Sequence, residues 1–360
     1  MKLMYVITQS ELGGAQSVVA NLSNYFASIK GNEVYIVSGG PGDAWKFLHP
    51  DIKVIYIKES QKKISWKDLI VLIKLFLIRF KYKPDKVHLH SSKAGILGRI
   101  AFSKKKVIYT VHGFDSIRVA FRRFLLFEKL LKNRANQIVG VSNYDAENLE
   151  KEGIKGSVCI YNGIEDFANP ARKFNTTDIQ NVIDFFDSLK KEGKFIVCSI
   201  ARLSKQKRYS LFCEVADIFK ENKEIVFVWI GNQMTPDYVP ENAYCLGEVA
   251  EAHRVLPYTD LFFLPSNYEG LPVSIIEALC YGKPIVASDT GGVNELLDGN
   301  NGHAIVNEAN LFAEKISLYK NDKLLYEDAC KAARTSYLEK FTLDTMCEQY
   351  KRILEKGVSQ

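Results

Sequence analysis

Short apolar runs alternate with longer amphipathic stretches along the whole chain. The runs at 3–8, 107–111, 195–200 and 261–264 have the length and the apolar content of fully buried strands. The stretches between them are long enough for the helices that connect parallel strands and cover a sheet. This alternation predicts an α/β chain built from doubly wound, Rossmann-like sheets.

Length and composition set the broad class. The 360 residues are enough for two domains, because single hydrophobic cores stop growing near about 250–300 residues. Apolar residues make up 47% and charged residues 25% of the chain, as in an ordinary soluble globular protein. The seven cysteines are scattered, without a Cys-x-x-Cys pair or a His/Cys cluster at metal-ligand spacing. This distribution favours reduced thiols in a cytosolic compartment over disulfides or a zinc site.

Charge is divided unequally between the two halves of the chain. Residues 1–164 hold 26 Lys and Arg against 13 Asp and Glu, whereas residues 165–360 hold 22 against 29. A basic half joined to an acidic half indicates that the first half meets an anionic partner, either nucleic acid or a membrane face. No nucleic-acid recognition motif accompanies the charge, so we expect no nucleic-acid partner.

Two segments of the basic half, 62–83 and 117–134, combine aromatic, aliphatic and basic residues. Composition alone favours burial of 62–83, because this segment is apolar nearly all round. The alternative is an amphipathic helix that rests on anionic lipid headgroups, and the similar segment at 117–134 favours this alternative. Neither segment is long and apolar enough for a membrane span, and the run after Met1 is too short for a secretory signal.

The strongest candidate chemistry lies in the stretch 261–291. It predicts a buried strand, a loop, a helix from about Val273 to Tyr281 and a second strand. Glu269 lies just before the helix and Glu277 lies within it. Such strand–loop–helix units present ligands at the carboxyl ends of strands, where the first helical turn offers free N–H groups to a phosphate or a sugar. Taken alone, two glutamates in this context are more often ordinary helix acids.

Glu269, Glu277 and the segment between them resemble the E-x7-E motif of retaining glycosyltransferases with the GT-B fold, in the large GT4-type family. The match continues at Pro284, Gly291, Gly292 and Glu295. With the segments described next, the resemblance covers nearly the whole chain. It implies two Rossmann-like, doubly wound domains that face each other across a cleft.

The resemblance also assigns roles within this stretch. Glu277 would accept hydrogen bonds from the ribose hydroxyls, as a carboxylate can accept two O–H groups at once. Glu269 would lie by the transferred sugar, where it would orient the sugar hydroxyls and take part in catalysis. The loop and helix start after Glu269 would contact the sugar or the phosphates through backbone groups. These donor-binding residues are Gly270, Leu271, Pro272 and Val273.

A second candidate segment, 201–210, carries Arg202 and Lys207 after a predicted strand. Two cations five positions apart across a strand-to-helix turn can both reach one diphosphate. The segment resembles the family's G-R-L-x-x-x-K-G, whose Arg and Lys hold the departing pyrophosphate. Ala201 stands where the family has its first Gly and Arg208 where it has its last, and neither change removes a cation.

Three candidates come from the first half of the chain. His112 follows the predicted strand 107–111, at the carboxyl end where active-site residues gather. The resemblance implies that His112 faces the transferred sugar. Gly13 and Gly14 precede a predicted helix and allow close approach of a ligand to the backbone. In the resembled family this loop lies near the donor phosphates and the acceptor.

Four further residues have weaker signals. Glu248 and Val249 follow a predicted strand and lead into a helix predicted at 249–256, in a loop that borders the nucleotide base in the resembled family. His88 and His90 flank the end of another predicted strand. We interpret both as ordinary strand and loop residues that could touch the acceptor.

The domain boundary follows from Asn162-Gly163-Ile164, which resembles the family's N-G-[VI] at the crossover between domains. We expect an N-terminal, acceptor-binding and membrane-facing domain at 1–164. A C-terminal, nucleotide-sugar-binding domain is expected at 165–340. The last helix, within 341–360, would cross back to the first domain, as in the resembled family.

The resemblance implies a retaining glycosyltransferase, a hexosyltransferase, of O-antigen or capsule polysaccharide biosynthesis. Its donor would be a UDP-hexose or a UDP-N-acetylhexosamine, and its acceptor a lipid-pyrophosphate-linked glycan at the inner face of the cell membrane. We expect no cofactor and no metal, because Arg202 and Lys207 can neutralise the diphosphate and the chain lacks an Asp-x-Asp triplet. The alternatives are another GT-B enzyme, such as a sugar-nucleotide epimerase or a soluble-acceptor transferase, and a non-catalytic nucleotide-sugar-binding partner.

Overall fold

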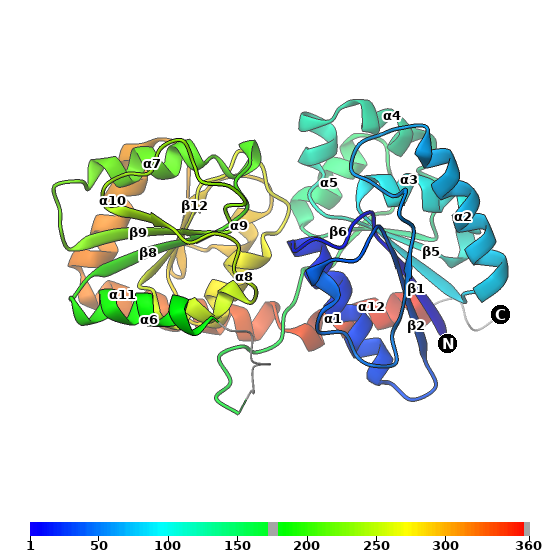
Figure 1. The fold of residues 1–360 in the computed structure, drawn as a ribbon. Helices are drawn as coiled ribbons and strands as arrows, with labels where there is room; N and C mark the ends of the chain where they lie inside the picture. The colour runs from blue at the N-terminus through cyan, green and yellow to red at the C-terminus, as the bar shows by residue number, and fades with distance from the viewer. Residues whose placement is uncertain (172–178, 356–360) are drawn as a thin grey trace. The chain divides into compact units, whose positions relative to one another are not determined.

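The computed structural model describes residues 1–171 and 179–355 and divides the chain into two compact units. The first unit combines 1–163 with the segment from Leu343 onward, and the second comprises 164–342. Each unit contains one parallel sheet with helices on its faces (Figure 1). The predicted α/β class with doubly wound sheets is therefore confirmed.

The sheet of the first unit has seven parallel strands in the order β3-β2-β1-β4-β5-β6-β7. Its central strands are buried along their whole length, which explains their continuous apolar runs. The order reverses between β1 and β4, which makes the carboxyl ends of these strands the topological switch point. The strands are β1 (Lys2–Val6), β2 (Glu33–Ser38), β3 (Lys53–Tyr56), β4 (Lys86–His90), β5 (Val107–Val111), β6 (Gln137–Gly140) and β7 (Val158–Cys159).

Six α-helices accompany this sheet in the described part of the first unit. They are α1 (Gly14–Ser28), α2 (Lys67–Tyr82), α3 (Ser92–Ala101), α4 (Arg123–Leu130), α5 (Asn143–Lys151) and α12 (Leu343–Glu355). The last of these comes from the far end of the sequence. Tyr350 of α12 is buried and its hydroxyl lies 2.9 Å from Oγ1 of Thr110 on β5. Glu348 accepts a 2.8 Å hydrogen bond from Tyr25 of α1, so α12 is tied to both strand and helix.

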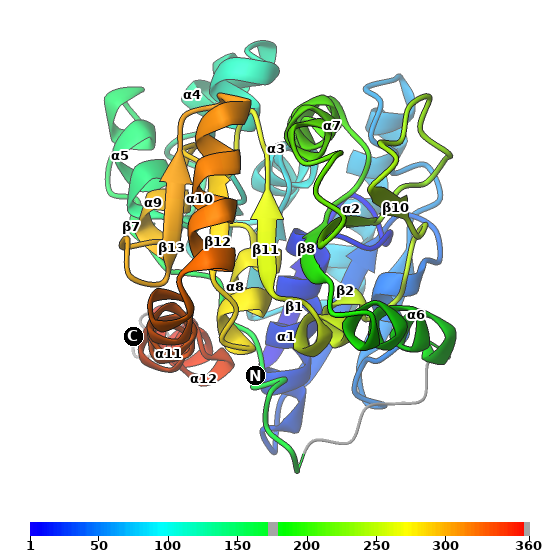
Figure 2. The same cartoon turned by 90° about the vertical axis from the view of Figure 1, so that its left-hand side faces the viewer.

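The sheet of the second unit has six parallel strands in the order β10-β9-β8-β11-β12-β13, with its switch point between β8 and β11. The strands are β8 (Phe195–Ile200), β9 (Ile225–Ile230), β10 (Ala243–Cys245), β11 (Leu261–Leu264), β12 (Ile285–Ser288) and β13 (Gly302–Ile305). The helices are α6 (Gln180–Lys191), α7 (Tyr209–Ile218), α8 (Val273–Cys280), α9 (Val293–Leu296), α10 (Ala309–Asn321) and α11 (Lys323–Lys340). Helices α7 and α10 pack together on one face of the sheet, and α8 and α11 pack together on the other (Figures 1 and 2).

Two predicted helices differ from the structure. The helix predicted at 249–256 is a 3₁₀ helix at 252–258 that contains Pro257, whose ring is incompatible with a longer α-helical hydrogen-bond ladder. In the segment 62–83, helix α2 begins only at Lys67. This helix is also not buried all round, since Val71, Leu75 and Ile78 face the core while the opposite face is exposed. Among residues 1–171 and 179–355, no helix has both the length and the apolar character of a membrane span.

Candidate functional site

Two neighbouring strands of the second unit bring the predicted donor-binding segments together. Strands β8 and β11 pair in parallel, with Leu261 beside Val197 and Phe262 beside Cys198. The carboxyl ends of parallel neighbours lie at the same edge of a sheet, and this pair forms the switch point. The loop with Arg202 and Lys207 and the loop with Glu269 therefore meet at one place.

Lys207 and Glu269 form an ion pair at this edge. Nζ of Lys207 lies 2.5 Å from Oε1 of Glu269, and the two side chains are only 16% and 5% exposed. The hydroxyl of Ser266 donates to the same Oε1 at 2.6 Å, and Nε2 of Gln206 lies 3.4 Å from Oε2. A buried carboxylate needs such partners, because an unpaired buried charge is strongly unfavourable. The sequence motifs predict both members of the pair, but not their contact.

The backbone of the two loops is joined as well. Asn267 N–H donates to the carbonyl of Gln206 at 2.8 Å, and Gly292 N–H donates to that of Gly270 at 2.9 Å. Gly291 has a positive φ of 58°, and a Cβ there would lie 1.9 Å from the carbonyl oxygen of Glu269. Only glycine fits this approach. The loops after β8, β11 and β12 thus form one connected rim.

Arg202 and Arg208 differ in their surroundings. Arg202 lies two residues after the end of β8, is exposed and makes no ion pair within residues 1–171 and 179–355, so its guanidinium is available to an anion. Arg208 has φ 42° and ψ 54°, a left-handed conformation, at the position just before α7. This explains why the resembled motif has glycine here, since glycine adopts that conformation without strain.

Glu277 lies on α8, in the second turn after the loop. Its side chain is half-buried, and no hydrogen bond to its carboxyl group occurs in the part of the chain that the structure describes. Burial raises the pKa of Glu277 to about 8, because the low-dielectric surroundings disfavour the charged form. This carboxyl group is therefore mainly protonated at pH 7 and can both donate to and accept from the hydroxyl groups of a ligand.

The loop between the two glutamates offers mainly backbone groups. The side chains of Leu271 and Val273 are buried, and Pro272 is the N-terminal cap of α8. The first turn of a helix has N–H groups without intrahelical partners, so Val273 at the start of α8 can present a donor to an anion or a hydroxyl, whereas Pro272 has no N–H. The apolar side chains of Leu271 and Val273 hold this segment in place.

Glu248 and Val249 follow β10, at the outer edge of the same sheet. Glu248 is exposed, whereas Val249 packs against a core cluster around Phe186 and Ile230. Any contact between Val249 and a base would therefore be made by its backbone groups.

In the first unit, His112 immediately follows β5, which pairs with β4. It is half-buried, and its Nε2 lies 2.8 Å from Nδ1 of His90, the last residue of β4. Burial lowers the pKa of His112 to about 4, so the ring is neutral at pH 7. Gly13 caps α1 after β1 with an extended backbone, and Gly14 begins that helix. The carboxyl ends of β1, β4 and β5 share one edge, so these candidates belong to one region.

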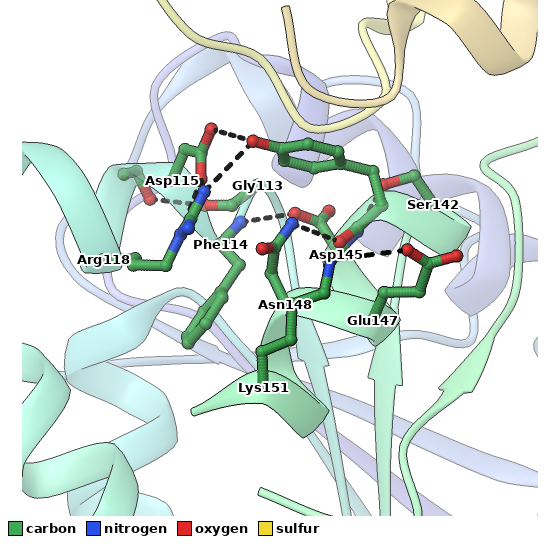
Figure 3. Close-up of polar contacts among 11 residues, drawn as sticks. Gly113, Phe114, Asp115, Arg118, Ser142, Asp145, Glu147, Asn148 and Lys151 are labelled. Atoms are coloured by element: carbon green, nitrogen blue, oxygen red, sulfur yellow. Dashed lines mark hydrogen bonds and ion pairs between the residues drawn. The ribbon is translucent and has the colours of Figure 1, made fainter. Parts of the chain in front are cut away.

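The loop after His112 is held by a polar network (Figure 3). Phe114 N–H donates to Oδ1 of Asp145 at 2.6 Å, which fixes the loop to α5. The carboxylate of Asp115 accepts hydrogen bonds from Arg118 at 2.7 Å and from the hydroxyl of Tyr144 at 2.9 Å. Asp115 is therefore engaged in holding the loop.

The site has no preformed metal centre in residues 1–171 and 179–355, where no three His, Cys, Asp or Glu side chains gather as metal ligands. What the second unit offers is one available guanidinium, one lysine paired to a carboxylate and one carboxyl group with a raised pKa. This set can bind a diphosphate and a pair of vicinal hydroxyls.

No sequence motif indicates the residues that hold these groups in place. Ser266 and Gln206 have no pattern that distinguishes them from ordinary loop residues. His90 was interpreted as an ordinary strand and loop residue, although its spacing of two from His88 places both on one face of β4. That spacing was the one signal that could have indicated a histidine cluster.

Two family models match the chain, one in each unit. The model of "Glycosyltransferase Family 4" matches residues 12–166, and that of "Glycosyl transferases group 1" matches residues 181–336. Together they span most of the chain.

Curated relatives match along most of their length. A UDP-Gal:alpha-D-GlcNAc-diphosphoundecaprenol alpha-1,3-galactosyltransferase of Escherichia coli is 29% identical over 81% of this chain and 81% of its own. An N,N'-diacetylbacillosaminyl-diphospho-undecaprenol alpha-1,3-N-acetylgalactosaminyltransferase of Campylobacter jejuni is 26% identical over 91% and 92%. The O-antigen biosynthesis glycosyltransferase WbnH of Escherichia coli is 27% identical over 97% and 98%.

Solved structures share the fold. HepE of Anabaena, in complex with UDP and glucose, superposes with a TM-score of 0.81 at 19% identity, covering 99% of this chain and 100% of that one. The sucrose-phosphate synthase of Thermosynechococcus elongatus gives a TM-score of 0.81 at 16% identity, covering 99% and 98%.

Proposed function

This chain belongs to the family 4 and group 1 glycosyltransferases and has their GT-B fold, and from this premise we propose that it transfers a sugar from a UDP-sugar to a lipid-linked glycan. The observation that carries the proposal is the Lys207–Glu269 pair at the β8/β11 switch point, with Arg202 available beside it. UDP as the nucleotide is supported by relatives that use or bind it.

The proposed chemistry is substitution at the anomeric carbon. The bond from this carbon to the diphosphate oxygen breaks, and the acceptor oxygen bonds to the carbon on the same face. The acceptor proton passes to the leaving phosphate oxygen, so configuration is retained. Negative charge grows on the diphosphate, and Arg202 and Lys207 stabilise it more in the transition state than in the ground state. No metal is needed for this role.

The donor's other parts have partners in the same unit. Glu277 would accept hydrogen bonds from the two ribose hydroxyls, for which its carboxyl group has open lone pairs. Glu269 would use its second oxygen on the sugar hydroxyls, because Oε1 is already engaged by Lys207 and Ser266. The pair therefore couples the diphosphate to the sugar through one rigid contact.

The acceptor proposal rests on relatives and on the surface of the first unit. Two relatives are named for undecaprenyl diphosphate-linked acceptors, and others for O-antigen or capsule synthesis. Such acceptors are held in a bilayer, so an enzyme that uses them benefits from resting on its surface. We place this enzyme's role in surface polysaccharide assembly at the inner membrane face.

Helix α2 supplies an apolar stripe for that surface. Large, exposed apolar side chains recur at every third or fourth position of the sequence here. This spacing places them on one side of a helix. These residues are Trp66 (75% exposed), Leu69 (64%), Ile73 (52%), Leu77 (63%) and Phe80 (66%). We call them the α2 stripe. The α2 stripe is flanked by lysines at 62, 63, 67, 74 and 81, whose positive charges attract anionic lipid headgroups.

The start of α2 is anchored rather than loose. Nζ of Lys93 donates to the carbonyls of Gln61 and Lys63, both at 2.6 Å, and pairs with Asp68 at 2.6 Å. Helix α3 packs against both α2 and α4, so the two amphipathic segments are neighbours of one helix. Segment 117–134 adds exposed Phe121, Leu126 and Leu130 with exposed Arg122 and Arg123.

Nucleotide binding tests the donor site directly. Calorimetry with UDP, GDP and ADP in EDTA should show tight binding of UDP alone by the wild type. Glu277→Ala should weaken UDP binding by about 100-fold, because the two hydrogen bonds between the carboxyl group and the ribose hydroxyls are lost. The matched control, Glu221→Gln, changes an exposed carboxylate of the same unit and should leave UDP affinity within about threefold. If none of the nucleotides binds, even with magnesium, the transferase proposal fails.

Transfer itself is tested with UDP-sugars and a sugar linked to a short polyprenyl diphosphate. The product's anomeric configuration, read from NMR couplings, should match that of the donor, and EDTA should not abolish the activity. Arg202→Met should lower kcat at least about 100-fold, as loss of a transition-state charge partner does. An inverted product refutes retention, and conversion of the donor to another sugar without transfer favours an epimerase.

A further inference from the structure

A stack of three histidines lies at the carboxyl edge of the sheet of the first unit. His88 and His90 point to the same face of β4 and are 3% and 0% exposed, and their ring centroids are 4.0 Å apart. His112, at the end of β5, stacks on His90 with centroids 5.1 Å apart and an interplanar angle of 27°. Only His112 reaches the surface of the unit, where it is half-buried.

The contact between His90 and His112 uses defined ring nitrogens. Nδ1 of His90 and Nε2 of His112 are 2.8 Å apart, a hydrogen bond in which one ring donates and the other accepts. Nε2 of His112 is thereby occupied. Nδ1 of His112 makes no hydrogen bond within residues 1–171 and 179–355, so it is the nitrogen left for a ligand.

Each ring in the stack carries one N–H. Burial lowers the pKa of His112 to about 4 and that of His88 to about 3, and it lowers the pKa of His90 well below 6.5. All three rings are therefore neutral at pH 7, and each holds its proton on a single nitrogen. The direction of the His90–His112 hydrogen bond then decides both tautomers.

The surroundings of His90 decide that direction. Nε2 of His90 is buried and has no hydrogen-bond partner in the part of the chain that the structure describes. If it carried the proton, an N–H group would be orphaned in the core, which is rarer in proteins than an acceptor without a donor. The proton of His90 therefore belongs on Nδ1, from which it is donated to His112.

We propose that His90 is a positioning residue, which donates its Nδ1–H to Nε2 of His112 and so fixes His112 as the Nδ1–H tautomer. His112 then presents a neutral hydrogen-bond donor at the carboxyl edge of the sheet. That this donor meets an oxygen of the transferred sugar rests on the proposed function. A neutral donor suits that place, because an imidazolium would repel the positive charge that develops on the sugar ring.

The test is the tautomeric state of His112 in full-length protein labelled with ¹⁵N-histidine. Two-bond proton–nitrogen spectra at pH 7.5 separate protonated from bare ring nitrogens, and His112→Gln assigns the signals. We expect Nδ1 of His112 to be protonated and Nε2 to be bare. Nε2 protonated in the wild type would overturn the proposal.

Variants of His90 separate positioning from folding. In His90→Asn the side-chain amide lies near the position of Nδ1 and can still donate, so the His112 tautomer should persist. His90→Phe should give a mixture of His112 tautomers and lower kcat about 10- to 100-fold, the range found when metal-bound histidines lose their orienting partners. UDP affinity should stay within about threefold, because Lys207 and Glu277 belong to the other unit. His88→Gln, the matched control in the same stack, should leave His112 unchanged.

The outcomes distinguish the two proposals. A His112 spectrum that is the same in wild type and His90→Phe overturns the positioning role. Spectra as expected from a protein that transfers no sugar from any UDP-sugar leave the His90–His112 assignment standing and refute the proposed function instead.

Discussion

Arg208 has a left-handed backbone conformation that is unfavourable for a residue with a Cβ. It lies at φ 42°, where a Cβ costs roughly 1–2 kcal/mol and glycine costs little. Arg208→Gly should therefore raise the free energy of unfolding of the second unit by about 1 kcal/mol, after the higher chain entropy of glycine in the unfolded state is subtracted. Urea denaturation measures this gain.

The matched variant is Arg208→Ala, which removes the charge and keeps the Cβ. It should gain no stability. Equal stabilisation by Ala and Gly would mean that charge, rather than backbone strain, is the cost at this position.

Glu277 makes the free energy of unfolding depend on pH, and the raised pKa of Glu277 sets the sign of this dependence. Its pKa is about 8 in the folded protein, against an ordinary value of 4.5. The folded state therefore binds the proton more tightly, and this contribution to stability is fully present below pH 4.5 and is lost as pH rises through 8. Glu277→Gln should match the wild type near pH 5 and exceed its stability near pH 9.

Thermal unfolding between pH 5 and pH 9 measures the difference between the two proteins. Glu248→Gln is the control on an exposed carboxylate, and its curve should run parallel to that of the wild type. A Glu277→Gln curve parallel to that of the wild type would place the Glu277 pKa near its ordinary value. Glu277→Gln should also weaken UDP binding. The native glutamate would therefore serve nucleotide binding at a cost in stability at high pH.

For single residues, the sequence predicted the identity of the site residues more accurately than their contacts. Lys207 and Glu269 were found through motifs, but their contact joins residues far apart in the chain and depends on β8 and β11 being neighbours. The role of His90 could not be predicted, because its partner lies on another strand.

Among the elements, α3 and α4 are joined by a buried ion pair. Arg99 and Glu128 are almost fully buried, with Nη2 and Oε2 2.6 Å apart, and Tyr109 donates to the other carboxylate oxygen at 3.1 Å. Glu128→Ala would leave the guanidinium of Arg99 buried without its counter-ion. It should destabilise the first unit by about 3–5 kcal/mol, as breaking a buried pair does.

The double variant Arg99→Met/Glu128→Leu tests this reason. It removes both charges and keeps much of the volume, so it should recover most of the stability in urea denaturation. If it is as unstable as Glu128→Ala, lost packing rather than an unpaired charge explains the effect. If Glu128→Ala loses vesicle binding and the double variant does not, the placement of α4 depends on a paired Arg99 side chain.

The elements themselves were largely predictable, because buried parallel strands have continuous apolar runs. Helix α2 was the exception. Composition favoured its burial, but only Val71, Leu75 and Ile78 face the core. The α2 stripe is as apolar as this buried face, so hydrophobicity could not tell one from the other. Tertiary packing decides which face is covered.

For the molecule as a whole, the uneven charge predicts salt-dependent membrane binding. The enzyme should float with vesicles that contain anionic lipid and be released by salt, which screens charges over about 10 Å at 0.1 M. Arg122→Glu/Arg123→Glu should weaken binding at least about 30-fold, because each basic residue near the surface contributes about 1 kcal/mol. Flotation with neutral vesicles should be weak.

The matched control is Lys323→Glu/Lys331→Glu on α11, which changes net charge equally on exposed residues of the other unit. It should float like the wild type. Equal loss of binding in both variants would mean that net charge, and not the surface of α2 and α4, determines the attraction.

The fold of the whole chain was predictable chiefly through the E-x7-E and Arg/Lys motifs, since periodicity alone gave only an α/β class. Those motifs constrain a strand, a turn and a helix at once, which few other folds allow. Helix α12 illustrates the limit, because nothing in its own residues indicates that Tyr350 reaches Thr110.

The return of α12 to the first unit has a consequence for synthesis on the ribosome. Residues 1–163 emerge first, but their sheet lacks Tyr350 and Glu348 until the whole second unit has been made. At about 5–20 residues per second, that delay is roughly 10 to 35 s. During this interval the surface later covered by α12 is open, including the hydroxyl of Thr110 and the ring of His88. The newborn first unit therefore stays incompletely covered until its last helix arrives.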